Sequence, residues 1–92
     1  MNNINIHDNF KDTNKFYVSK AVANLIPSSL ARQYGLFPIK REGQKLFIGI
    51  EDPYNFIAID HLNRITGLEI IASQAPRDII DHQIDDLYGN ES

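Results

Sequence analysis

The sequence contains no cysteine, and its longest apolar runs are only a few residues. Without cysteine the chain can form no disulfide framework, no thiolate metal site and no thiol nucleophile, so its fold must hold by packing alone, as cytoplasmic domains usually do. The short apolar runs exclude a membrane-spanning helix and the core of a signal peptide. We therefore expect a cytoplasmic protein without direct membrane insertion, which reaches a membrane only through a partner.

Motifs for nucleotide phosphates and for catalysis are missing as well. The segment Gly43–Lys45 is not followed by Ser or Thr and lacks the upstream glycine of a Walker loop, and the glycines do not fall into a G-x-G-x-x-G spacing. His61 has no serine or second base at a spacing that would identify a catalytic dyad, so we interpret it as a residue at the edge of the core. The sequence therefore predicts a protein that is not an enzyme, has no cofactor and does not hydrolyse ATP by itself.

The composition is that of one small folded domain. The chain has 92 residues, of which 42% are hydrophobic and 23% are charged, close to ordinary globular usage. Residues 1–15 hold five of the nine asparagines and show no sustained period, so we expect a flexible leader there. We place a single domain at residues 16–89 and a tail at residues 90–92.

Proline and glycine divide this domain into regular elements. Pro27 suits the first turn of a helix, and Gly35 suits its end because glycine adopts positive φ freely. Asp52 and Pro53 have the form of another helix start, with the Asp52 carboxylate capping open N–H groups. Residues 16–25 allow either a short helix or an extended segment. The predicted elements are a helix at 27–34, a hairpin of strands at 36–41 and 45–50, a helix at 52–66, a strand at 68–72 and a helix that starts within 73–76 and ends before Gly89.

The order of these elements, α-β-β-α-β-α, predicts an α+β fold, a two-layer sandwich with a small three-stranded sheet. Pro38 cannot donate a hydrogen bond to a neighbouring strand, so we expect its strand either at an edge of the sheet or paired at Pro38 through the carbonyl oxygen only. We also expect one hydrophobic core. Its predicted members are Leu30, Leu36, Ile39, Leu46, Ile48, Ile50, Ile57, Leu62, Ile65, Ile70, Ile80, Ile84 and Leu87.

A basic group of residues is the first candidate for a partner or ligand surface. If the hairpin folds beside the first helix, Arg32, Lys40, Arg41 and Lys45 converge near aromatic residues, as binding of a nucleotide phosphate would require. The same charges are also ordinary on an exposed edge strand that avoids unwanted pairing. The sequence leaves both interpretations open.

An acidic group in the last helix is the second candidate. Asp78, His82 and Asp86 recur at four-residue steps, with Asp81 and Asp85 one position earlier in each turn. Residues of these types could bind a divalent metal, could receive a basic surface of a partner, or could simply form a solvated face. We name Asp78, His82 and Asp86 as a possible docking face and assign no metal ligand.

The two halves of the chain carry opposite charge. Residues 1–50 have seven Lys or Arg and three Asp or Glu, a sum of +4, whereas residues 51–92 have two and nine, a sum of −7. Such a dipolar chain suits docking to another protein better than binding nucleic acid, which favours a concentrated basic face. Charges that merely solvate the surface are the alternative.

Several segments resemble one known family in order and spacing. They are Leu25–Ile39, which matches an "IP…LA…yg..P" pattern, Leu46–Pro53, which matches a hydrophobic strand before an "a-DP" helix start, Thr66–Ile70, and Leu87–Gly89 at the end of the closing helix. In these segments the chain is similar to the N-terminal domain of type II secretion and type IV pilus assembly ATPases. The Walker motifs, aspartate boxes and tetracysteine zinc site of the motor are absent, so we expect either an excised domain or a short stand-alone relative.

The resemblance implies a non-catalytic protein-interaction module. In secretion ATPases this domain docks on the cytoplasmic domain of an inner-membrane assembly-platform protein, and it works with the motor ATPase domain in cis or in trans. Some relatives carry a longer version that binds cyclic di-GMP through tandem "RLG…L…G" motifs upstream of the matched part. Arg32–Gly35 is only superficially similar to that motif and lies in another segment, so we carry over no ligand residue and keep a regulatory cyclic di-GMP-binding domain as the alternative function.

Overall fold

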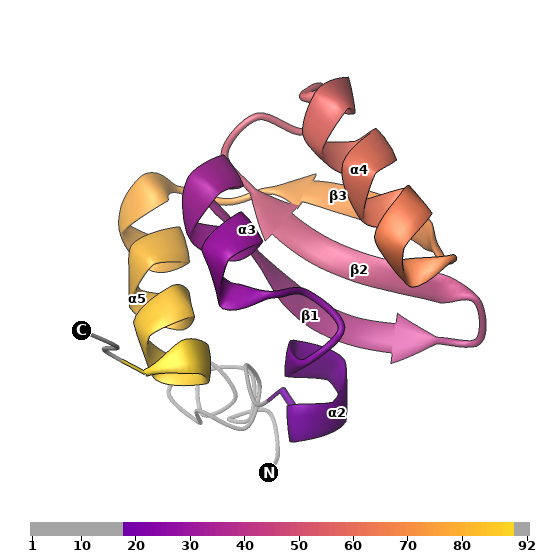
Figure 1. Cartoon of the computed structure of the whole chain (residues 1–92). Coiled ribbons are helices and arrows are strands. Elements are labelled where there is room, and N and C mark those ends of the chain that lie inside the picture. The colour runs from indigo at the N-terminus through magenta and orange to yellow at the C-terminus, as the bar shows by residue number, and fades with distance from the viewer. Residues whose placement is uncertain (1–17, 90–92) are drawn as a thin grey trace, which may run out of the picture.

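A computed structural model of the chain describes residues 18–89. The predicted leader at residues 1–15 and tail at residues 90–92 lie outside the described residues. Figure 1 shows the elements in chain order. They are α2 (Lys20–Ala23), α3 (Ser28–Tyr34), β1 (Leu36–Glu42), β2 (Lys45–Ile50), α4 (Phe56–Thr66), β3 (Glu69–Gln74) and α5 (Arg77–Tyr88).

The predicted α-β-β-α-β-α order is confirmed, and α2 precedes it. α2 lies in the segment that the sequence left open between a short helix and an extended chain. Its start is fixed by Ser19, whose hydroxyl accepts a hydrogen bond of 3.2 Å from the backbone N–H of Val22. Within residues 18–89, no helix has both the length and the apolar character that a membrane span needs.

The three strands form one mixed sheet in the order β1-β2-β3. β1 and β2 are antiparallel and joined by a turn in which Gly43 has a φ of 62°, whereas β2 and β3 are parallel and connected through α4. A register shift between Pro38 and Lys40 interrupts the ladder of β1 and β2, next to the residue that has no N–H to donate. β1 therefore lies at an edge of the sheet as predicted, and β3 forms the other edge.

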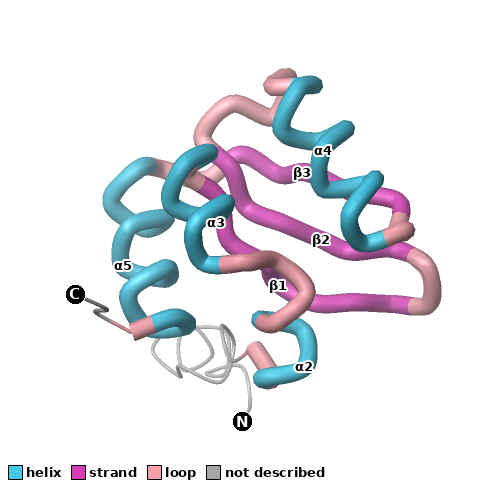
Figure 2. The backbone as a smooth tube through the Cα atoms, viewed as in Figure 1, coloured by secondary structure: helices cyan, strands magenta, loops and turns pink. Residues whose placement is uncertain are grey.

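The helices form a second layer against this sheet. Figure 2 shows α3 and α4 in front of the strands, and α5 packs beside α3. Leu46, Ile48 and Ile50 alternate along β2, so their side chains share one face, and they join Ala58 and Leu62 of α4 in a single buried core. The predicted two-layer α+β sandwich is thus confirmed.

The start of α4 differs from the prediction. Asn55 caps this helix, because its side-chain oxygen accepts a hydrogen bond of 3.2 Å from the N–H of Ala58. Asp52 instead accepts a hydrogen bond of 2.9 Å from the N–H of Tyr54 in the turn before the helix. The helix ends at Gly67, whose φ of 74° is the left-handed conformation that glycine adopts freely.

Two predicted core residues of α4 are wrong. The side chains of Ile57 and Ile65 are 76% and 46% exposed, whereas Ala58 and Leu62 are fully buried. Successive helix residues point about 100° apart, so a buried face centred on Ala58 and Leu62 directs Ile57 away from the sheet. Ile65 is spaced to share the face of Ala58 and Leu62, but it lies in the last turn of α4, which ends at Thr66. The other predicted core residues are buried or pack against the core.

Candidate functional site

The basic residues of the hairpin lie where β1 and β2 meet the turn. Lys40 pairs with Glu42 at 2.9 Å and also lies 5.0 Å above the ring of Phe47. The guanidinium of Arg41 donates a hydrogen bond of 2.8 Å to the carbonyl oxygen of Gly43 and so braces the turn. These contacts are exposed, and two of the three predicted cations on the hairpin already have local partners.

The structure does not bring Arg32 together with the other three predicted basic residues. Lys45 is exposed at the first position of β2, next to the turn, whereas Arg32 lies on α3 and points to α5. Arg32 donates a hydrogen bond of 2.7 Å to the carbonyl oxygen of Gly89 and lies 3.4 Å from the carboxylate of Asp85. The amino-acid sequence alone does not indicate the contact between Arg32 and α5, because that contact depends on how α3 and α5 pack.

The predicted acidic residues lie on the solvent-exposed side of α5. His82 Nε2 lies 3.5 Å from Asp86 Oδ2, and Asp78 is exposed in the first turn. Asp81 and Asp85 belong to another side of the helix, since both pair with arginines. In the described part of the chain, no group of three or more His, Cys, Asp or Glu side chains lies close enough to hold a metal ion.

Arg77 and Tyr88 fix the two ends of α5. Arg77 contacts the carboxylates of Glu51 at 3.4 Å and Asp81 at 3.2 Å. The hydroxyl of Tyr88 donates to the carbonyl oxygens of Ala23 and Ile26, at 3.2 and 3.1 Å. Burial raises the pKa of Tyr88 from its ordinary 10.0 to about 12, so its hydroxyl remains a donor even in alkaline solution. These contacts give Arg77 and Tyr88 a structural role, which is to hold the two ends of α5 in place.

An exposed apolar patch, which the sequence reasoning missed, lies at the start of α4. We define the apolar patch as Tyr54, Phe56 and Ile57, of which the first two are 74% and 67% exposed. The rings of Tyr54 and Phe56 meet edge to face, with centroids 6.2 Å apart. One signal was available: Phe56 and Ile57 are adjacent in a helix, so both cannot face the same core.

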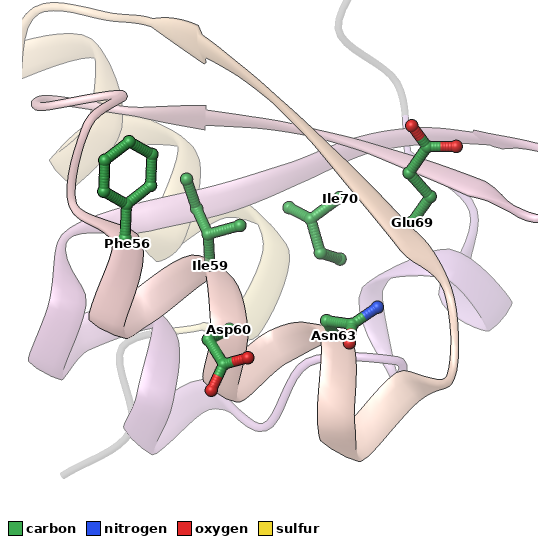
Figure 3. Close-up of a pocket in the computed structure, with 6 residues that line it drawn as sticks. All are labelled: Phe56, Ile59, Asp60, Asn63, Glu69 and Ile70. Carbon is green, nitrogen blue, oxygen red and sulfur yellow. The ribbon is translucent and has the colours of Figure 1, made fainter.

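Next to the apolar patch, a groove of about 440 Å³ runs between α4 and the edge strand β3. Figure 3 shows Phe56 and Ile59 on the α4 side of this groove and Ile70 on the β3 side. Polar side chains complete its lining. The groove residues are Phe56, Ile59, Asp60, Asn63, Glu69 and Ile70.

The opposite side of α4 is tied to the rest of the protein. His61 is half-buried, and its Nδ1 shares a hydrogen bond of 3.0 Å with the hydroxyl of Tyr34 on α3. The two rings meet edge to face at 84°. The groove therefore lies on the side of α4 that points away from α3.

Curated relatives of this chain are type IV pilus assembly ATPases named PilB. The chain is 40% identical over 63 residues to the protein from Pseudomonas aeruginosa, covering 68% of this chain and 11% of that protein. It is 30% identical over 83 residues to the protein from Myxococcus xanthus, covering 90% and 14%, and 34% identical over 70 residues to the protein from Thermus thermophilus, covering 71% and 8%. The chain thus spans only a small part of the length of these relatives.

Solved structures share the fold. A structure of MshE with cdg has a TM-score of 0.71 at 24% identity, covering 84% of this chain and 56% of that one. The N-terminal domain of XpsE has a TM-score of 0.63 at 26% identity, covering 75% and 45%. The XpsE match is thus to an N-terminal domain. Residues 10–92 match the MshEN domain, and the chain belongs to this family of N-terminal domains of secretion and pilus assembly ATPases.

Proposed function

We propose that this chain is a protein-docking module that connects a type IV pilus assembly or type II secretion ATPase to its membrane platform. The partner is the cytoplasmic domain of an inner-membrane assembly-platform protein. The chain then acts in the cytoplasm, at the inner membrane through that partner, with the motor ATPase domain in cis or in trans. The PilB relatives favour the pilus system as its setting.

The apolar patch is the observation that carries this proposal. Three large apolar side chains are exposed within four residues, and the rings of two of them, Tyr54 and Phe56, contact each other on the surface. Clustered exposed apolar side chains are typical of an interaction site. Aromatic side chains are enriched among residues that dominate protein interfaces. Covering Tyr54, Phe56 and Ile57 with a partner would remove this apolar area from water, which favours association.

Titration calorimetry between the purified chain and the cytoplasmic domain of the platform protein tests the proposal. We expect the wild-type chain to bind, and the double variant Tyr54→Ser, Phe56→Ser to bind at least about tenfold more weakly. Ile79→Ser, which changes a partly exposed isoleucine on α5, is the matched control and should bind like the wild type. Absence of binding by the folded wild-type chain would contradict the docking function.

The same calorimetric titration with the platform domain tests the charged surfaces that the sequence predicts. A variant with Lys40, Arg41 and Lys45 changed to alanine tests the basic hairpin, and Arg32→Ala tests the separate cation on α3. A variant with Asp78, His82 and Asp86 changed to alanine tests the acidic docking face on α5. A surface whose removal weakens binding belongs to the interface, and one whose removal changes nothing does not.

Regulation by cyclic di-GMP is a second candidate function. The supporting observation is the likeness in fold to MshE, whose structure was determined with this nucleotide. An NMR titration with cyclic di-GMP, run beside GTP as a charge control, tests it. Saturable shifts confined to Lys40, Arg41, Lys45 and their neighbours, and absent with GTP, would support a ligand site on the hairpin. No shift at millimolar ligand would reject it for this chain.

A further inference from the structure

The outer edge of β3 carries backbone groups with no neighbouring strand in the described part of the chain. The N–H of Glu69 donates to the carbonyl oxygen of Gln44 at 2.8 Å. The N–H of Ala75 donates in the same way to the carbonyl oxygen of Ile50 at 2.9 Å. Since backbone groups of consecutive strand residues point to opposite sides, the odd-numbered residues of β3 face β2.

The even-numbered residues consequently face outward. Ile70, Ala72 and Gln74 present both N–H and C=O to the outer edge. The carbonyl oxygen of Leu68, which points the same way, accepts a hydrogen bond of 2.8 Å from the side chain of Asn63. The outward row therefore begins with one satisfied acceptor and continues with groups that a further strand could pair.

The groove lies where the side chains of such a strand would go. Phe56 and Ile59 of α4 and Ile70 of β3 line this groove from its two sides (Figure 3). A strand added beside β3 would place every second side chain under α4, against these three residues. The 440 Å³ of the groove then serves as the pocket that selects those side chains.

The edge also lacks the features with which sheet proteins prevent pairing. From Ile70 to Gln74 the strand has no proline and no charged residue, and its register with β2 shows no shift. Prolines, lysines and bulges are the usual means of blocking an edge strand. β3 therefore has both the geometry and the composition to accept another strand.

The charge of the groove indicates the chemistry of that strand. Asp60 and Glu69 line the groove, and only Asp60 pairs with a cation in the described residues, with Arg64 at 3.1 Å. The residues that line the groove thus include two carboxylates and no lysine or arginine, so a segment with lysine or arginine beside its apolar residues complements the lining. The cations nearest to these carboxylates lie outside the lining: Arg64 pairs with Asp60, and Lys45 stands opposite Glu69 in the register of β2 and β3. A second copy of this chain would instead bring two such linings together.

We propose that β3 binds an extended, basic segment of the partner protein as a fourth strand of the sheet, with apolar side chains of that segment in the groove between α4 and β3. This inference rests on the proposed docking function and specifies its surface. Backbone hydrogen bonds to Ile70, Ala72 and Gln74 hold the segment, and Phe56 and Ile59 select its apolar side chains. Glu69 favours a cation near the start of β3.

Amide hydrogen exchange of the whole chain tests the pairing directly. Two probes are used: the cytoplasmic domain of the platform protein, and a synthetic octapeptide of alternating valine and lysine. We expect either probe to slow exchange at Ile70, Ala72 and Gln74 by at least about tenfold, with little change at the already bonded Ile71 and Ser73. The same octapeptide with glutamate in place of lysine is the charge control and should bind at least about fivefold more weakly.

Two substitutions provide independent tests. Ala72→Pro removes an outward N–H and leaves the bonds to β2, so it should weaken binding of both probes by about tenfold. Phe56→Ser removes an exposed side chain at the groove and should weaken binding without affecting the fold. Ile79→Ser again serves as the matched control.

The outcomes separate this inference from the docking function. If the platform domain binds but the alternating protection is absent and Ala72→Pro binds normally, the docking function stands and strand addition is overturned. If the platform domain fails to bind but the lysine octapeptide protects the even-numbered amides, the edge is a strand-binding site for another partner. If neither probe binds, or the free chain dimerises through β3 in sedimentation experiments, the proposed occupant is wrong.

Discussion

The two edge strands of the sheet, β1 and β3, differ in the features that prevent pairing with a further strand. β1 carries Pro38, a register shift and three charged residues at its end, Lys40, Arg41 and Glu42. β3 begins with Glu69 and continues with isoleucine, alanine, serine and glutamine in an undisturbed register with β2. The features of β1 prevent pairing with another strand, whereas β3 has none of them between Ile70 and Gln74.

This difference shows where specificity for a partner can reside in so small a domain. An unprotected edge is an aggregation risk, so a sequence that protects one edge and leaves the other open has a use for the open one. The exposed apolar patch lies beside the open edge, not the protected one, because α4 connects β2 to β3. Phe56 belongs to both the patch and the groove, and Ile70 belongs to both the groove and β3, so patch, groove and edge adjoin one another.

The largest expected effect comes from β2, the strand that both edges share. Ile48 is fully buried in the centre of the sheet, so Ile48→Ala should lower the free energy of unfolding by about 2 to 5 kcal/mol. Ile57→Ala, on the exposed side of α4, is the control and should change it by less than about 0.5 kcal/mol. Urea denaturation measures both values, and equal losses would mean that the buried face of α4 is misassigned.

A pair of prolines tests the direction of the backbone groups in β3. Ser73→Pro removes an N–H that faces β2 and leaves an acceptor unpaired, so it should cost about 3 kcal/mol of unfolding free energy. Ala72→Pro removes an N–H that faces outward and should cost less than about 1 kcal/mol. Urea denaturation of the two variants compares these costs. A larger loss of unfolding free energy in Ala72→Pro than in Ser73→Pro would show that the even-numbered residues of β3, not the odd-numbered ones, pair with β2.

A substitution at Gly49 tests the contact between β1, the edge strand that carries Phe37, and β2 in the centre of the sheet. A Cβ at Gly49 would lie 2.7 Å from the ring of Phe37, which is nearly buried and has little room to move. Gly49→Ala should therefore destabilise the fold by about 1 to 3 kcal/mol, as overpacking does. Combining it with Phe37→Leu should recover part of the loss, and thermal unfolding of the four chains measures the coupling. Additive losses would contradict the steric explanation.

The fold could be predicted because the residues that begin and end its helices and strands act through local backbone geometry. Gly35 and Gly67 end helices in the left-handed conformation, and Pro38 lies on an edge strand, each for a reason that acts within a few residues. The start of α4 was wrong because Asp52 and Asn55 can both cap, and the sequence does not rank them. The prediction for Ile57 is wrong because several neighbouring residues of this helix are apolar, and residue type alone does not show that the buried face is centred on Ala58 and Leu62.

The candidate surfaces were harder to predict, because they depend on packing between elements. Arg32 was grouped with the hairpin cations, yet α3 directs it to Asp85 on α5. The groove consists of a helix side and a strand edge whose closeness follows only from the crossover between β2 and β3. The adjacent pair Phe56 and Ile57 indicates the apolar patch, because two neighbouring helix residues cannot face the same core, but it does not indicate the groove.

The smallest expected effect concerns the protection of β1. Lys40→Val should change the free energy of unfolding by less than about 0.5 kcal/mol, because the exposed pair with Glu42 is solvent-screened and valine suits a strand. The same substitution removes a charge from an edge, so sedimentation velocity at rising concentration should detect self-association that the wild type and Lys40→Arg do not show. If Lys40→Val stays monomeric, Pro38 and the register shift suffice to block β1. The contrast between the edges would then rest on backbone geometry rather than on charge.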